Sequence, residues 1–335
     1  MSCREVSIAF QTNKSASEYI ALAKLINEYH FDVVSVYCDL PYQPSYGPLL
    51  LMAPYIKKSR LGPAAVSPSR IHPLDIAANS ALLSQIAEGG IYVGLARGAW
   101  LENYGINEVD KPIQGIKEAC FIIRKILSGD LPGFHGEVFY ISRTMKVPYP
   151  VPGEEIPILI GTWGPKLSRV AGEIADEVKV GGSSNPNFGM MIKGWINEGK
   201  ENSHRSKDTV KLVMGAVTVV DEDGERAKQK AKEELVVYFP VVAQLDKTLN
   251  IPPDLIQRIK IHLERDETKA AAQLISDDLM EKFAFAGTPN DVIRQSEALY
   301  EAGVDRIEFG TPHGISSKVG IDLIGRKVLP NLPTR

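Results

Sequence analysis

The sequence lacks several features that would assign it to a broad class of protein. Its 335 residues include only three cysteines, Cys3, Cys38 and Cys120, which are odd in number and widely spaced. We therefore expect reduced, packed thiols and neither a disulfide framework nor a zinc knot. The six histidines show no paired metal-ligand spacing, so no metal site is predicted.

An excess of charge of one sign and a long apolar run are also missing. Thirty-eight Lys and Arg residues against 41 Asp and Glu residues give a formal net charge of -3, which does not point to nucleic acid or to an anionic membrane surface. No apolar run approaches the length of a membrane span, and Arg4 and Glu5 before a short strand do not follow the order of a signal peptide. We expect a cytoplasmic protein with a small-molecule partner.

What the sequence does contain is a repeated alternation of short apolar runs and segments with helical periodicity. The predicted strands lie at 6–10, 31–37, 61–66, 91–96, 158–160, the segment that ends at Gly181-Gly182, 211–220 and 305–309. Eight such units favour a closed parallel (β/α)8 barrel, a TIM barrel, formed by residues 1–335 as a single domain. A doubly wound sheet is the alternative, weakened because residues 11–14 carry no glycine fingerprint.

Two segments do not fit this alternation. Residues 131–150 contain glycines, prolines and a short aromatic run, which predicts an extended excursion after the fourth helix. Residues 228–283 are mostly helical in composition and are interrupted at 250–253, which predicts an insertion of several helices between the seventh and eighth strands.

The stretch 156–184 reads as strand, tight turn, helix, strand and turn. Gly161 and Gly164 permit a compact turn around Thr162 and Trp163, and Pro165 suits the first turn of a helix. Free backbone N–H groups at that helix start favour an anion, and Gly181 and Gly182 add accessible backbone at the end of the next strand. Together they suggest a phosphate cradle, although glycines at such turns often bind nothing.

Three more strand ends carry candidate site residues. Asp39 follows the second strand and could orient a cofactor ring, or it could be a loop carboxylate that stabilises a turn. The small residues Ala64, Ala65 and Val66 could let backbone approach a flat ligand, or they could serve close packing.

The fourth strand ends in Ala96, Arg97 and Gly98. The guanidinium of Arg97 could bind a phosphate or a carboxylate there. It could equally form an ion pair with an acid of a neighbouring loop. Trp100 and Trp163 could be packing residues.

Several passages occur together in a characteristic order. They are Gly-Thr-Trp-Gly-Pro-Lys from Gly161, Ala-Gly-Glu-Ile-Ala-Asp from Ala171, Lys111-Pro112, Ala-Gly-Thr-Pro-Asn-Asp-Val from Ala286, and Ala-Gly-Val-Asp-Arg-Ile-Glu-Phe-Gly from Ala302 with Thr311-Pro312. With them, nearly the whole chain resembles the luciferase-like superfamily, and within it the branch of methylenetetrahydromethanopterin reductases that use the deazaflavin coenzyme F420.

The resemblance implies a (β/α)8 barrel with the deazaflavin at the carboxyl ends of the strands and its phosphate at the turns after the fifth and sixth strands. It also implies a non-prolyl cis peptide at Ala64–Ala65 and a homodimer or higher assembly. Asp39 would then be both a catalytic and a cofactor-binding residue. The other implied cofactor-binding residues are Ala64, Ala65, Val66, Ala96, Arg97, Gly98, Gly161, Thr162, Trp163, Gly164, Gly181 and Gly182.

The chain departs from the reductase pattern at three places. The family places a glutamate in the first strand as a proton donor, where this chain is aligned at Ala9. A histidine that follows the family aspartate is replaced by Leu40, and Ala99-Trp100 replaces an acid after the glycines of the fourth strand. These differences concern the pterin substrate and the protonation step more than the coenzyme.

The leading hypothesis is hydride transfer between coenzyme F420 and a substrate stacked on it, with methylenetetrahydromethanopterin or a related tetrahydropterin as that substrate. A flavin-dependent monooxygenase of the same superfamily, with FMN in the same cleft, is one alternative. A catalytically silent deazaflavin-binding protein is the other, motivated by Ala9 and Leu40.

Overall fold

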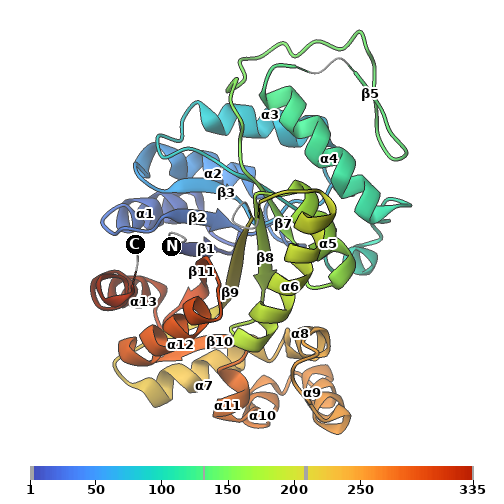
Figure 1. Cartoon of the computed structure of the whole chain (residues 1–335). Coiled ribbons are helices and arrows are strands. Elements are labelled where there is room, and N and C mark those ends of the chain that lie inside the picture. Colours follow the sequence, from blue (N-terminus) through green and yellow to red (C-terminus); the bar gives the residue numbers. More distant parts are fainter. Residues whose placement is uncertain (1–3, 131–132, 207–209, 334–335) are drawn as a thin grey trace.

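The computed structural model describes residues 4–130, 133–206 and 210–333. In this part of the chain nine parallel strands form one sheet at the centre of the molecule, with helices around it (Figure 1). Cys38 and Cys120 are buried free thiols, as expected. Cys3 lies outside the described residues.

Eight of the strands follow one another in the order β3-β2-β1-β11-β9-β8-β7-β4. Isolated parallel bridges join Leu61 to Ile91 and Val66 to Leu95, so β3 also lies beside β4 and the sheet closes into a barrel. These eight strands correspond to the eight that were predicted, and the doubly wound alternative is excluded. Their bounds are β1 (Glu5–Phe10), β2 (Val33–Val36), β3 (Arg60–Pro63), β4 (Val93–Ala96), β7 (Ile158–Gly161), β8 (Glu177–Gly181), β9 (Lys211–Val220) and β11 (Arg306–His313).

The sequence predicts capped helix starts at Ser15 and Thr288, and local capping signals do begin several of the surrounding helices. Ser15 and Thr288 each form a capping box with the acid three residues later, and Pro165 occupies the first turn of α5. The helices that cover the barrel are α1 (Ala16–Ile26), α2 (Tyr46–Met52), α3 (Pro73–Ser84), α4 (Pro112–Leu127), α5 (Pro165–Ile174), α6 (Pro186–Asn202), α12 (Pro289–Glu301) and α13 (Ser317–Leu323).

Two additions depart from a plain barrel. After α4 the chain forms a small hairpin of β5 (Phe134–His135) and β6 (Tyr140–Ile141), which projects at the top of Figure 1. After β9 comes a helical group with its own apolar core, at the bottom of Figure 1. It consists of α7 (Gly224–Leu235), α8 (Phe239–Leu245), α9 (Pro253–Glu264), α10 (Thr268–Gln273) and α11 (Asp277–Met280). The ninth strand, β10 (Ala284–Gly287), pairs with β9 and was not predicted.

The hairpin after α4 is fastened by one buried carboxylate. Glu118 accepts hydrogen bonds from the backbone N–H groups of Glu137, Val138 and Phe139 at 2.7–3.0 Å, and from the side chain of Gln114. Burial alone would raise the pKa of Glu118, but these hydrogen bonds outweigh burial and lower it below its usual value.

Charged side chains fill the half of the barrel interior that is nearer the amino ends of the strands. Arg306 of β11 is fully buried and donates from both terminal nitrogens to Glu177 of β8, at 2.8 and 2.6 Å. Glu177 is also paired with Arg60, and Glu5 with Lys211. Burial alone would raise the pKa of Glu177, but the charges of Arg306 and Arg60 outweigh burial and lower it.

A second buried ion pair lies nearer the carboxyl ends of the strands. Lys179 of β8 pairs with Glu308 of β11, and Glu308 also accepts a hydrogen bond from Ser35 at 2.6 Å. Tyr92 connects the two levels, because its hydroxyl donates to Ser35 and its ring lies 5.9 Å from the guanidinium of Arg306. The network therefore runs from the amino ends of the barrel strands to just below their carboxyl ends.

We predict that Glu177→Gln destabilises the fold by about 3–5 kcal/mol, because it leaves the charge of Arg306 buried without its bidentate partner. Urea unfolding would measure the loss. Glu198→Gln is a matched control on the exposed pair between Arg169 and Glu198, where a change below about 1 kcal/mol is expected. Equal effects of the two substitutions would contradict a structural role for the buried network.

His313 ends β11 and fixes the neighbouring strand end. It is fully buried, its backbone has a φ of 75°, and its Nε2–H donates to the carbonyl of Ala9 at 3.1 Å. Burial lowers the pKa of His313 to about 4. The imidazole is therefore neutral near pH 7.

We predict that this histidine makes the fold less stable in mild acid. Its folded pKa lies below its unfolded value of about 6.5, so the unfolded chain takes up the proton first as the pH falls. The free energy of unfolding should drop by about 3 kcal/mol between pH 6.5 and 4 through this group. Urea unfolding at several pH values should show a shallower dependence in His313→Gln, whereas His135→Gln, at an exposed position, should keep the original slope.

Candidate functional site

The predicted site residues gather at the carboxyl ends of the barrel strands. We call this region the mouth. It comprises Gln11, Tyr37, Asp39, Ala64, Ala65, Ala96, Arg97, Gly98, Gly161, Thr162, Trp163, Gly164, Gly181 and Gly182. All of these residues lie at or directly after the end of β1, β2, β3, β4, β7 or β8, which is where ligands bind in barrels of this type.

The turns after β7 and β8 are joined to each other. The indole Nε1–H of Trp163 donates to the carbonyl of Gly181 at 2.7 Å, and the backbone N–H of Thr162 donates to the carbonyl of Lys179 at 3.0 Å. The hydroxyl of Thr162 accepts from the N–H of Gly164, which is the N-cap of α5. The two turns therefore form one rigid unit, and Trp163 has a hydrogen-bonding role that its size alone did not predict.

This unit leaves open space above it. A Cβ atom placed on Gly164 or on Gly181 would meet no atom within 4 Å, whereas one on Gly161 would lie 3.3 Å from the Cβ of Ala96 and 4.0 Å from that of Ala65. Small side chains thus line one side of the mouth. The first N–H groups of the ten-residue helix α5 begin beside this space and have no partner within their helix.

At the end of β3 the three neighbouring predicted residues differ in their surroundings. The Ala64–Ala65 peptide bond is cis, at the position that the family resemblance implies, and both residues are half-buried. Val66, by contrast, is fully buried, and its N–H and carbonyl both bond to β4, at Gly94 and Ala96. Its side chain belongs to the core, and a cofactor-binding role for Val66 stays a prediction.

Arg97 is engaged by a protein carboxylate. Its Nε and Nη2 donate to the two oxygens of Glu108 at 2.7 and 2.6 Å, and this pairing raises the pKa of the guanidinium. The alternative of an ion pair with a loop acid is thus what the structure shows. Gly98 follows with a φ of 97°, so the turn there favours glycine. A ligand role for either residue stays a prediction.

Asp39 projects at the mouth and is exposed. Its Oδ2 accepts a hydrogen bond from Nε2 of Gln11 at 3.1 Å. Ala9, where the family resemblance places a glutamate, is fully buried inside the barrel. The side chain that β1 brings to the mouth is that of Gln11, a residue that our sequence analysis did not select.

Tyr37 is a second residue that the sequence analysis missed. It is half-buried, its ring lies 5.0 Å from Nζ of Lys179, and a Cβ on Gly310 would lie 2.6 Å from its hydroxyl. Alternation along the first two strands was the available signal. Ser7, Ala9 and Gln11 share one face of the strand and its extension, as do Ser35, Tyr37 and Asp39.

The helical group after β9 also borders the mouth. Val242 of α8 lies against Gly182, where a Cβ would come within 3.0 Å of its Cγ1. Tyr238, just before α8, is 41% exposed, but partial burial of its hydroxyl, and then the charges of Tyr42 and Asp39, raise its pKa to about 12. Its phenol is therefore protonated and able to donate a hydrogen bond at neutral pH.

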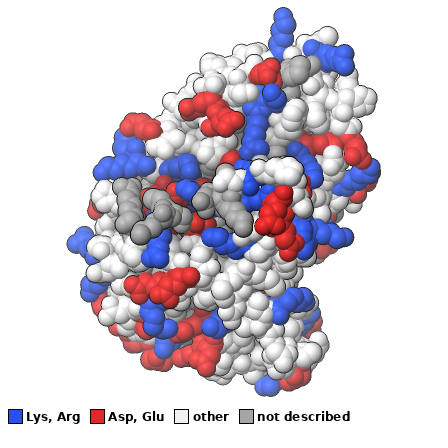
Figure 2. Space-filling model, viewed as in Figure 1, with Lys and Arg blue, Asp and Glu red and all other residues white. Residues whose placement is uncertain are grey.

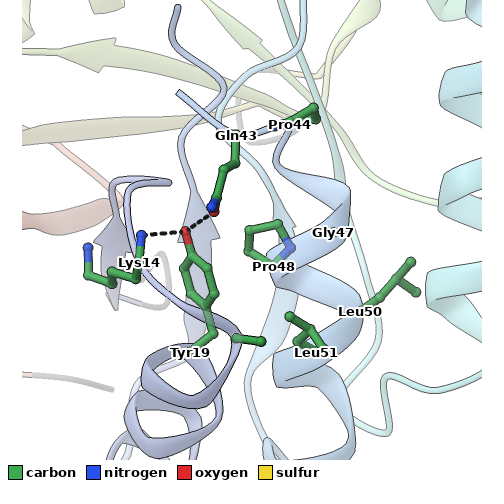
Figure 3. Close-up of a pocket in the computed structure, with 9 residues that line it drawn as sticks. Lys14, Tyr19, Gln43, Pro44, Gly47, Pro48, Leu50 and Leu51 are labelled. Carbon is green, nitrogen blue, oxygen red and sulfur yellow. Dashed lines mark hydrogen bonds between the residues drawn. The ribbon is translucent and has the colours of Figure 1, made fainter. Parts of the chain in front are cut away.

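A separate surface hollow of about 570 Å³ lies between α1 and α2, outside the mouth (Figure 3). Tyr19 donates to Oε1 of Gln43 there and accepts from the backbone N–H of Lys14. These bonds tie the loop after β1 to the loop after β2. The hollow thus lies behind the two loops that carry Gln11 and Asp39.

The face shown in Figure 2 has Lys and Arg side chains interspersed with Asp and Glu. Across residues 4–130, 133–206 and 210–333, no three His, Cys, Asp or Glu side chains are grouped so as to hold a metal ion. Within the same ranges, each helix is too short or too polar to cross a membrane.

Comparisons with known proteins agree with this architecture. The chain is 29% identical over 318 residues to a 5,10-methylenetetrahydromethanopterin reductase of Archaeoglobus fulgidus, which covers 92% of this chain and 94% of that protein. A reductase of the same name from Methanopyrus kandleri is 29% identical over 314 residues, or 88% and 89% of the two chains. The solved structure of a coenzyme F420-dependent tetrahydromethanopterin reductase from Methanopyrus kandleri superimposes with a TM-score of 0.87 at 24% identity, covering 98% and 99% of the two chains.

A family model described as luciferase-like monooxygenase matches residues 5–306, which include every strand of the barrel except β11, of which only the first residue, Arg306, is matched. The family that the sequence resemblance indicated is thereby confirmed. This chain belongs to the luciferase-like monooxygenase family.

Proposed function

We propose that this protein is a coenzyme F420-dependent oxidoreductase that transfers hydride from the reduced deazaflavin to methylenetetrahydromethanopterin or a related tetrahydropterin. The observation that carries the proposal is the mouth itself, where two turns joined by Trp163 and Gly181 border an open space lined by small residues. The proposal draws its substrate from the similarity of the whole chain to reductases of that name.

The residues of the mouth fit such a coenzyme. Ala65, Ala96 and Gly161 leave room for a flat ring, and the open positions at Gly164 and Gly181 leave room for a phosphate beside the start of α5. When bound, the deazaflavin supplies the hydride. The protein would hold it, orient it against the substrate and exclude water from the reacting faces.

The side chains near β1 and β2 would face the substrate. Asp39 is an exposed carboxylate, and Tyr238 is a protonated phenol that feels the charge of Asp39, so this part of the site offers both a hydrogen-bond acceptor and a donor. Asp39 is therefore our candidate catalytic residue. A cytoplasmic homodimer or higher assembly also belongs to this proposal and is supported by the family resemblance.

One alternative function is favoured by a specific finding. The family model that matches the chain is described as a monooxygenase, and the same open mouth could hold FMN. Absorption spectra distinguish the two cofactors, because a flavin and a deazaflavin absorb at different wavelengths.

We predict that the protein binds coenzyme F420 in preference to FMN and oxidises its reduced form when methylenetetrahydromethanopterin is added. Titrations followed by absorbance and fluorescence would measure binding, and the return of the oxidised deazaflavin band would measure turnover. Binding without turnover with any tetrahydropterin would support a silent binding protein. Binding of FMN alone would overturn the proposal.

We further predict that Gly181→Val weakens F420 binding at least tenfold while the protein stays folded. The new side chain would enter space that is open in the protein, so it should block the ligand without displacing neighbours. Gly194→Val is the matched control, because Gly194 lies on the exposed side of α6 and its Cβ position is equally open. Equal binding by both variants would show that the coenzyme lies elsewhere.

A further inference from the structure

The contact between Gln11 and Asp39 has a fixed chemical direction. Oε1 of Gln11 accepts the backbone N–H of Thr12 at 2.9 Å, so the amide nitrogen faces the carboxylate of Asp39. The reversed amide would place its oxygen against a carboxylate and its NH2 group against an N–H, and both contacts would be repulsive. Gln11 is therefore a hydrogen-bond donor to Asp39.

The backbone around Asp39 is anchored on both sides. Arg70 donates to the carbonyl of Cys38 at 2.7 Å, and the N–H of Tyr42 donates to the carbonyl of Asp39 itself at 3.2 Å. The loops after β1 and β2 are also joined, because the N–H of Gln43 donates to the carbonyl of Thr12 at 3.0 Å. With the backbone held in this way, the direction of the Asp39 carboxylate depends on its side-chain contact.

That contact leaves most of the carboxylate available. One hydrogen bond uses one of about four acceptor positions of an ionised carboxyl group. Within the described residues no Lys, Arg or His forms an ion pair with Asp39, and Lys14, on the same loop as Gln11, donates to the carbonyl of Gln11 and to Asn13. The remaining acceptor positions are not taken up by a protein cation.

We propose that Gln11 is a positioning residue, which holds the carboxylate of Asp39 as an acceptor for a ligand group that donates a hydrogen bond or carries positive charge. Gln11 acts through Asp39 and does not itself exchange a proton. This inference rests on the proposed function for its ligand, since both a deazaflavin and a tetrahydropterin present N–H groups. The side chain that follows β1 at the mouth would thus act through its amide group.

A double-mutant cycle tests the proposal. Gln11→Met keeps the length of the side chain and removes the donor, Asp39→Asn removes the charge, and Gln43→Ala disturbs the same pair of loops without contacting Asp39. We expect Gln11→Met to lower kcat/KM for the tetrahydropterin about tenfold in the wild-type background and less than twofold in Asp39→Asn. Gln43→Ala should change it less than twofold.

Gln11→Glu is a second variant, which keeps the proposal testable if Gln11→Met does not fold. It keeps the shape of the side chain but places a second carboxylate against Asp39. Its loss of kcat/KM should therefore exceed that of Gln11→Met. Equal losses for Gln11→Met in both backgrounds, or an equal loss in Gln43→Ala, would overturn the proposal.

A ligand-free measurement separates this proposal from the proposed function. In ¹H–¹⁵N spectra, the side-chain amide signals of Gln11 should shift in Asp39→Asn and stay in place in Gln43→Ala. Unmoved signals in Asp39→Asn would refute the placement of the amide. If the signals shift but the wild-type protein binds no deazaflavin, the proposed function fails while the Gln11–Asp39 contact stands.

Discussion

The buried pairing of Arg306 with Glu177 constrains how the strands of the barrel meet. Both side chains are almost entirely buried, and Nε of Arg306 has no hydrogen-bond partner within the described residues. Such charges are tolerated only when they meet, because one left alone would cost several kcal/mol. The pairing therefore specifies the register of β8 and β11 against β9, which lies between them. A slip of one residue would turn the charges outward and apolar side chains inward.

The same filling explains why glycines occur within these strands. A Cβ on Gly62 would lie 2.5 Å from the ring of Tyr92, and one on Gly215 would lie 3.0 Å from the Cβ of Glu308. Large polar side chains occupy the barrel interior below the mouth, and glycine makes room for them. Toward the carboxyl ends of the strands the inward positions are occupied by alanine and glycine. No side chain fills the space beside Gly181, so the interior opens into the mouth. The site is the part of the barrel that the network does not fill.

The sequence allowed the eight barrel strands and many helix starts to be predicted because their signals are local. The capping boxes at Ser15 and Thr288 and the proline at position 165 each depend on residues three positions apart or fewer. Strand β10 was missed because four residues, Ala-Phe-Ala-Gly, show no decisive pattern and gain their pairing only from β9. The turns at the mouth were placed correctly for the same local reason.

The side-chain partners at the site could not be predicted in this way. Glu108 lies eleven residues from Arg97, and Glu308 lies 129 residues from Lys179, so only the closed barrel brings them together. Charges alternate with apolar residues in Glu-Val-Lys-Val-Gly and in Arg-Ile-Glu-Phe-Gly, a pattern that marks inward polar positions. Which face points inward is known only once the barrel is recognised. The burial of the Val66 side chain likewise depends on the path of the chain after Ala65.

The mouth combines two kinds of surface, one made of backbone turns and one made of side chains. The turns after β7 and β8 present backbone groups and open space, which many sequences can supply as long as a few small residues are kept. The ends of β1 and β2 present side chains, here Gln11, Tyr37 and Asp39, and each substitution among them changes the chemistry offered to a second ligand. A chain of this fold can thus keep such open turns while the side chains at the ends of β1 and β2 change. Ala9 and Leu40, where the sequence departs from the family pattern it resembles, belong to β1 and to the loop after β2. Ala9 is buried inside the barrel, and Gln11 is the side chain at the end of β1 that reaches the mouth.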